Sequence, residues 1–254
     1  ASPRMFDLVI GADGLHSEVR KVAFGEEALF SKNLGFYVSY FSIPNYMGLD
    51  RWEIEYHHQQ QKFIIMYGSE PNQDAVAGFA FSAAPFTFDY RNINEQKNVL
   101  HEAFGNVGWQ AGKLLELLNQ SPKFYFDAAM QIHMPCWTKG RTCLVGDAAY
   151  APSPVSGQGT SVAIVGAYVL ANKLAKAHGN YEVAFKNYEE QMRPFVKKNQ
   201  GLVDLSVAIM DHDSFIGYLH RHMSEHMQEG WGQLVKELSA RRIHDAATAL
   251  VLEE

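Results

Sequence analysis

Cysteine is scarce in this sequence, and the sequence also lacks an excess of basic charge and a long hydrophobic run. The two cysteines, Cys136 and Cys143, have a spacing that fits neither a CxxC redox motif nor a zinc knuckle. So few cysteines indicate a reduced, cytoplasmic setting. A formal net charge of −6 disfavours nucleic acid and anionic lipid as partners. The longest apolar stretch, 162–171, is about half the length of a membrane span, and no signal peptide is visible. We therefore expect no membrane association.

Hydrophobic residues make up 47% of the 254 residues, which is enough for one large domain or two small ones. The opening segment, 6–12, has the pattern of a strand buried on both faces of a parallel sheet. Parallel strands need neighbours and crossover connections, and nothing in the sequence precedes this strand. We therefore expect a truncated protein. Its N-terminal segment is either lost or supplied by a second chain.

Aromatic and β-branched runs dominate the region 34–90, and turn residues separate them. This pattern predicts an antiparallel sheet with one face covered. The expected strands are 35–43, 52–56, 62–67, 75–82, 124–134 and 141–146. The expected helices are 17–24, 95–104, 109–118, 159–177, 181–200, 201–227 and 231–250.

The first motif, Asp7 to Arg20, is a strand followed by Gly-Ala-Asp-Gly and a short helix for which Ser17 is a plausible N-cap. It delivers a carboxylate, Asp13, to the carboxyl edge of a sheet, where ligands bind in open α/β folds. Gly11 and Gly14 let the backbone approach a ligand closely. Asp13 can accept hydrogen bonds from ligand hydroxyls, or it can cap the helix that follows.

The second motif, 140–161, begins with a strand that ends in Gly-Asp and continues through a proline-containing loop. Its carboxylate, Asp147, suits a pair of ribose or ribityl hydroxyls. Gly157 and Gly159 lead into a helix whose N-terminus favours an anion or a developing negative charge. A generic strand–helix connection is the alternative. The combination of Gly-Asp, two prolines and Gly-x-Gly in one window disfavours it.

The two motifs, in this order, resemble those of the class A flavoprotein monooxygenases, the para-hydroxybenzoate hydroxylase-like family. This family includes aromatic-ring hydroxylases and tetracycline-inactivating monooxygenases. The resemblance implies FAD as cofactor, NAD(P)H as co-substrate, and O2 and a small aromatic or polycyclic molecule as substrates. The expected function is that of an oxidoreductase, a hydroxylating flavoprotein monooxygenase. The alternative is a non-catalytic remnant of the same fold that does not bind flavin by itself.

The resemblance also implies which residues contact the cofactor. Asp147 would bind the ribityl or pyrophosphate region, and Pro154 would lie beside the isoalloxazine ring. The backbone amides of Gly157 to Ser161 would face the pyrimidine end of the flavin. This suits a reduced flavin, which is anionic near N1 and C2=O. The implied cofactor-binding residues are Asp13, Gly14, Asp147, Pro154, Gly157, Gln158, Gly159, Thr160 and Ser161. The sequence singles out no catalytic acid or base and no metal site.

The expected fold is mixed α/β and α+β. Residues 1–30 and 135–200 would form a partial FAD/NAD(P)-binding Rossmann-like domain. Residues 31–134 would form an antiparallel substrate-binding sheet domain, and 201–254 would form C-terminal helices.

The sequence departs from the family pattern at three places. The Gly-x-Gly-x-x-Gly fingerprint is absent, so the adenosine half of FAD has no obvious site. Tyr150 stands where the family usually has His, and Val165-Gly166 stands where an acidic residue is common. We interpret the last two as subfamily variation.

The histidines have simpler interpretations than metal binding. We expect the pair His57-His58 in a solvated hairpin turn. His133 either faces the substrate pocket or is a hydrogen-bonded core residue, and we favour the second interpretation. The group around His212 is interpreted as part of a surface helix.

Overall fold

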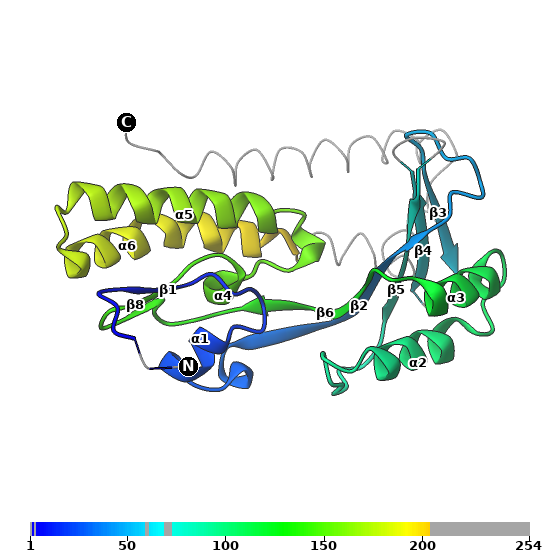
Figure 1. Ribbon diagram of the computed structural model, residues 1–254, viewed down its shortest axis with the longest axis horizontal. Helices are drawn as coiled ribbons and strands as arrows, with labels where there is room; N and C mark the ends of the chain where they lie inside the picture. Colours follow the sequence, from blue (N-terminus) through cyan, green and yellow to red (C-terminus); the bar gives the residue numbers. More distant parts are fainter. Residues whose placement is uncertain (1, 3, 59–60, 69–72, 204–254) are drawn as a thin grey trace, which may run out of the picture. The chain divides into compact units, whose positions relative to one another are not determined.

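The computed structural model describes residues 2, 4–58, 61–68 and 73–203 (Figure 1). The chain divides into two compact units, one from the described parts of Ala1–Lys32 and Met130–Glu254, the other from Asn33–Ala129. Residues from 204 onward lie outside the described residues. They include the helix expected at 231–250, nearly all of the one expected at 201–227, and the histidine group around His212.

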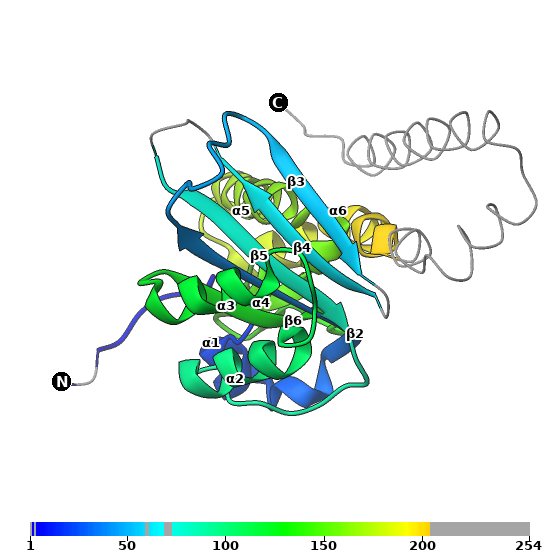
Figure 2. The ribbon, with the colours of Figure 1, turned by 90° about the vertical axis from the view of Figure 1, so that its right-hand side faces the viewer.

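The second unit is built on a five-stranded sheet with the order β3-β4-β5-β2-β6. Strands β3 and β4, β4 and β5, and β2 and β5 pair antiparallel. Helices α2 and α3 cover one face of the sheet (Figure 2). Alternate residues of a strand point to the same face. Phe41 and Phe79 therefore share this face and form its core with Phe104 of α2. The elements are β2 (Ser31–Ile43), β3 (Glu53–His58), β4 (Lys62–Tyr67), β5 (Ala75–Ser82), α2 (Ile93–Phe104), α3 (Ala111–Gln120) and β6 (Phe124–Ile132).

The first unit contains a small sheet with the order β1-β8-β7, and β1 runs parallel to β8. Helices α5 and α6 lie side by side (Figure 1), and their buried faces share a core with Trp137, Tyr150 and Tyr188. The elements are β1 (Val9–Gly11), α1 (Glu18–Phe24), η1 (Glu27–Leu29), β7 (Thr138–Lys139), β8 (Thr142–Leu144), α4 (Asp147–Tyr150), η2 (Pro154–Ser156), α5 (Gly159–Lys176) and α6 (Tyr181–Gln200).

The structure confirms the mixed α/β architecture and corrects the opening strand. The strand is not 6–12 buried on both faces but the short β1, and Val9 and Ile10 are each 40% exposed. Among the described strands β1 pairs only with β8, which comes later in the chain.

Two expectations about histidines were wrong. His57 and His58 belong to β3, not to a turn, and the His57 ring nitrogen lies 3.0 Å from Glu55 Oε2. His133 is hydrogen-bonded to Gln131 Oε1 at 2.8 Å, but it is exposed rather than in the core. Within the described residues no three His, Cys, Asp or Glu side chains gather as metal ligands. None of the helices seen there is both long and apolar enough to cross a bilayer.

Candidate functional site

The parallel pairing of β1 and β8 brings the two sequence motifs together. Val9 pairs with Thr142 and Gly11 with Leu144, and Val145 N–H continues the ladder by donating to Gly11 O at 2.9 Å. Both strands therefore end at the same edge. The loop that carries Asp13 and the segment that carries Asp147 emerge side by side, at the kind of edge where ligands bind in α/β folds.

This close approach requires Gly11. A Cβ built on Gly11 would lie 2.6 Å from Leu144 Cδ2 and 2.9 Å from Val19 Cβ. Any side chain here would therefore push α1 and β8 away from β1. Gly14 has a different role, because its φ of 84° belongs to the left-handed region that favours glycine.

Asp13 caps helix α1. Its Oδ1 accepts a hydrogen bond from Ser17 Oγ at 2.5 Å, and its Oδ2 accepts one from Val19 N–H at 3.1 Å. Ser17 Oγ in turn accepts from Arg20 N–H at 2.9 Å, as the predicted N-cap should. Burial would raise the pKa of Asp13, but these hydrogen bonds outweigh it and lower the pKa. The structure thus shows the capping role that the sequence left as an alternative. A contact of Asp13 with the cofactor stays a prediction.

Asp147 has a different environment. It begins α4 directly after Gly146, whose φ is 66°. The carboxylate is half-buried, and burial raises its pKa. Among the described residues it has no hydrogen-bond or ion-pair partner. Oδ1 lies 4.0 Å from the position a Cβ would take on Gly159, so the carboxylate faces the first residue of α5.

The loop before α5 is held by its own hydrogen bonds. Ser153 Oγ accepts from Val155 N–H at 3.3 Å, and Ser156 Oγ donates to Ser153 O at 2.7 Å. Gln158 N–H donates to Ser156 Oγ at 3.1 Å. Gly157 N–H likewise donates to Pro154 O at 3.0 Å. The backbone N–H groups of Gly157 and Gln158, which were expected to face the cofactor, are therefore already used within the loop.

No side chain caps the N-terminus of α5. Its first N–H groups therefore carry the partial positive charge of a helix end. Gly157, in the left-handed conformation, lies just ahead of the helix and is exposed, as is Pro154. Thr160 and Ser161 are also exposed. These predicted cofactor residues are thus accessible, and their contacts with a cofactor stay predictions.

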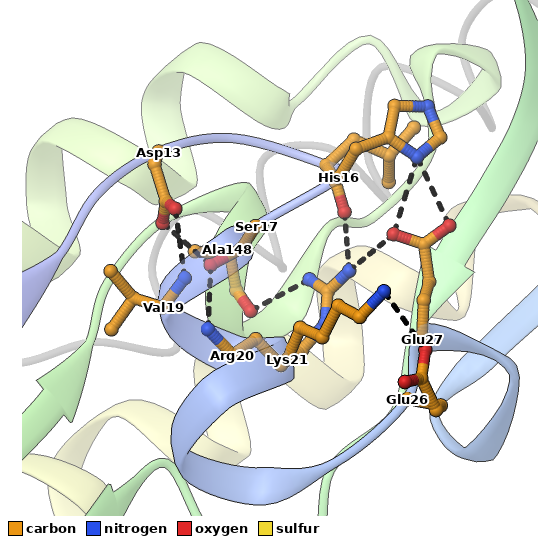
Figure 3. Close-up of polar contacts among 10 residues, drawn as sticks. Asp13, His16, Ser17, Val19, Arg20, Lys21, Glu26, Glu27 and Ala148 are labelled. Atoms are coloured by element: carbon orange, nitrogen blue, oxygen red, sulfur yellow. Dashed lines mark hydrogen bonds and ion pairs between the residues drawn. The ribbon is translucent and has the colours of Figure 1, made fainter.

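Arg20 ties the two loops together, a role that its place at the end of a motif did not suggest. The side chain is wholly buried, yet it donates from Nη1 to Ala148 O at 2.9 Å and from Nη2 to Leu15 O at 2.5 Å. Nη2 also forms an ion pair with Glu27 Oε2 at 2.6 Å (Figure 3). Sequence reasoning missed Glu27 altogether, because no local pattern marks it.

The departures at Tyr150 and Gly166 are two sides of one contact. A Cβ on Gly166 would overlap the Tyr150 hydroxyl, so the two residues fit only as a pair. The hydroxyl is hydrogen-bonded to Tyr188 Oη at 2.9 Å, and Tyr188 Oη donates to Leu144 O at 3.1 Å. Burial raises the pKa of Tyr150 to about 12, so the phenol stays neutral. The pair therefore braces β8 against α5 and α6.

Comparison with known proteins agrees with this geometry. A family profile described as "FAD binding domain" matches residues 6–201. A flavin-dependent monooxygenase from an unidentified prokaryote is 48% identical over 197 residues, which is 77% of this chain and 50% of the relative. One from Legionella longbeachae serogroup 1 (strain NSW150) is 44% identical over 196 residues, with 77% and 50% coverage. The crystal structure of tetracycline destructase Tet(51) superposes with a TM-score of 0.81 at 38% identity, covering 99% of this chain and 64% of that one.

The chain belongs to this FAD-binding family, the class A flavoprotein monooxygenases, as the two motifs predicted. It spans about half the length of the curated relatives it matches.

Proposed function

We propose that the protein is an FAD-dependent monooxygenase that hydroxylates a small aromatic or polycyclic molecule, with NAD(P)H as the reductant and O2 as co-substrate. The observation that carries the proposal is the environment of Asp147. It is a half-buried carboxylate with a raised pKa and no hydrogen-bonding partner in the described structure, and it lies beside the uncapped N-terminus of α5.

The residues of this site fit the flavin and ribityl portion of FAD. A desolvated carboxylate gains most from hydroxyl donors, which a ribityl chain provides. The first amides of α5 favour negative charge, which a reduced flavin ring carries near N1 and C2=O. When bound, FAD supplies the redox and oxygen-transfer chemistry.

The chain's own residues would bind, orient and stabilise charge. Asp147 would accept hydroxyl hydrogen bonds and fix the position of the cofactor chain. The N–H groups of Gly159, Thr160 and Ser161 would point at the negative end of the ring. Pro154 and Gly157, which lack bulky flexible side chains, would form the surface beside the ring.

The face of the five-stranded sheet opposite α2 and α3 (Figure 2) supports an aromatic substrate. Strand alternation places Tyr40 on the face opposite Phe41, away from α2 and α3. Tyr40 and Tyr67 are 38% and 40% exposed. The Tyr40 ring lies over Gly78, where a Cβ would lie 3.0 Å from its Cδ1. We propose that this face contacts the substrate, and the relative Tet(51) makes a tetracycline-like polycycle the first compound to test.

The test is the visible absorption of the purified protein in its complete natural chain, before and after incubation with FAD. We expect the bands of an oxidised flavin, followed by NAD(P)H oxidation and O2 uptake that increase on adding substrate. A colourless protein that takes up no FAD would contradict the proposal and favour a non-catalytic remnant. Flavin binding without any NAD(P)H oxidation would limit the protein to flavin binding.

A further inference from the structure

Arg20 joins the two loops of the candidate site through their backbone carbonyls. The carbonyl of Leu15 belongs to the Asp13 loop, and that of Ala148 directly follows Asp147. Since one guanidinium holds both carbonyls, a shift of Arg20 changes the position of Asp147 relative to the first loop. No side chain of this clamp is among the residues predicted to touch the cofactor.

The positive charge of this clamp is compensated by Glu27. Arg20 is wholly buried, and its Nε has no hydrogen-bond partner in the described structure. Of the two carboxylates near it, Asp13 is already engaged by Ser17 and Val19. Glu27 Oε2 lies 2.6 Å from Arg20 Nη2. A buried guanidinium that loses its anion moves toward solvent or another acceptor, and here it would release Leu15 O and Ala148 O.

Glu27 is itself oriented from its other side. His16 Nδ1 lies 3.0 Å from Glu27 Oε1 and 3.2 Å from Oε2. The carboxylate, part of η1, is therefore held between His16 and Arg20 (Figure 3). Glu27 lies outside both sequence motifs but is built into the support of both loops.

We propose that Glu27 is a positioning residue for FAD: through Arg20 it sets the position of Ala148 and so of Asp147 relative to the Asp13 loop. This inference rests on the proposed function. It predicts that a side chain without predicted cofactor contact controls how tightly, and in which environment, the flavin is held.

The neighbouring residue provides a matched control. Glu26 also forms an ion pair, with Lys21 at 3.4 Å, but these side chains are 71% and 52% exposed. Such a solvated pair contributes little. The variants Glu27→Gln and Glu26→Gln therefore remove the same charge one residue apart, one inside the clamp and one outside it.

The experiment measures FAD dissociation constants by flavin fluorescence, together with the visible circular dichroism of the bound flavin, in the complete natural protein. For Glu27→Gln we expect a dissociation constant raised on the order of tenfold, as is typical when an orienting partner behind a ligand-binding group is lost, and an altered flavin dichroism. Glu26→Gln should match the wild type in both. Glu27→Asp, which keeps the charge, should fall between Glu27→Gln and the wild type.

The outcomes are distinguishable. If the wild type binds FAD and Glu27→Gln binds it equally well with an unchanged dichroism, the positioning role is wrong while the proposed function stands. A lower melting temperature with unchanged affinity and dichroism would also overturn it. If the wild type takes up no FAD, the proposed function itself fails. Should Glu27→Gln not fold, Glu27→Asp decides, since wild-type affinity and dichroism in that variant would contradict the proposal.

Discussion

Asp13 and Asp147 occupy equivalent places, each following the carboxyl end of one of two paired parallel strands, yet their surroundings are opposite. Asp13 receives two hydrogen bonds from its own helix, which lower its pKa. Asp147 is half-buried without a partner in the described structure, and its pKa is raised. A carboxylate that is satisfied internally stabilises the fold, whereas one left unsatisfied holds binding capacity for a ligand. The comparison supports our proposal that the Asp147 segment is the main ligand-binding loop and that the Asp13 loop has mainly a structural role.

The largest expected effect comes from separating the two loops. Gly11→Ala would place a Cβ 2.6 Å from Leu144 Cδ2, and such overpacking destabilises by about 1–3 kcal/mol. Chemical denaturation should show this loss. Gly108→Ala is the control, because nothing lies within 4 Å of the Cβ position there. Equal stability of the two variants would contradict the close contact between β1 and β8.

Removing the carboxylate of Asp13 should cost stability even without cofactor. Asp13→Ala leaves Val19 N–H without its acceptor and frees Ser17 Oγ, and losing such a helix cap costs about 1 kcal/mol. Thermal unfolding of the cofactor-free protein measures the effect. An unchanged melting temperature would mean that Asp13 does not act as a cap.

The free energy of unfolding should depend on pH through the ionisation of Glu27 and Asp13. Burial opposes ionisation of Glu27, but His16 and Arg20 outweigh this effect. The pKa of Glu27 is therefore lower in the folded protein than its ordinary value of 4.5. The pKa of Asp13 is likewise lower than its ordinary value of 3.8. Their contribution is complete above these ordinary values and is lost as pH falls through the lowered folded values. Glu27→Gln should therefore flatten the acid limb of a plot of unfolding free energy against pH. An unchanged limb would contradict the lowered pKa of Glu27.

The smallest expected effect has the opposite sign. Because burial raises the pKa of Asp147, its ionised form is less favourable in the folded than in the unfolded chain, and at neutral pH it weakens the fold. Asp147→Asn should leave the cofactor-free protein as stable as the wild type or more stable, with a change within about 0.5 kcal/mol. A clear loss of stability at pH 7 would show that Asp147 has a structural role instead.

Much of the fold could be predicted from the sequence, because alternation and turn residues locate the sheet strands and the helices between them. The N-cap at Ser17 follows from residue type alone. What local patterns do not contain is pairing between distant positions. The ion pair of Arg20 with Glu27 and the fit of Tyr150 to Gly166 depend on how elements pack.

The sequence predicted that the two loops meet at one sheet edge, but it did not predict which groups each loop uses for its own hydrogen bonds. Two Gly-containing loops with carboxylates, each after a strand, indicate one ligand edge. Only the hydrogen bonds show that the Gln158 amide is used by Ser156 and that Asp13 is engaged by α1. The hydrogen-bond partners of an amide or carboxylate decide between a structural and a binding role, and residue type alone does not reveal those partners.

The most direct measurement is FAD titration of the wild type, Asp147→Asn and Asp13→Asn in the complete natural protein, with each variant first shown to be folded. We predict that Asp147→Asn weakens FAD binding by about 10–100-fold, as expected when a charged hydrogen-bond acceptor is lost, and that Asp13→Asn changes it far less. If Asp147→Asn binds FAD like the wild type, or if Asp13→Asn loses as much affinity, the division between a scaffolding loop and a ligand-binding loop is wrong.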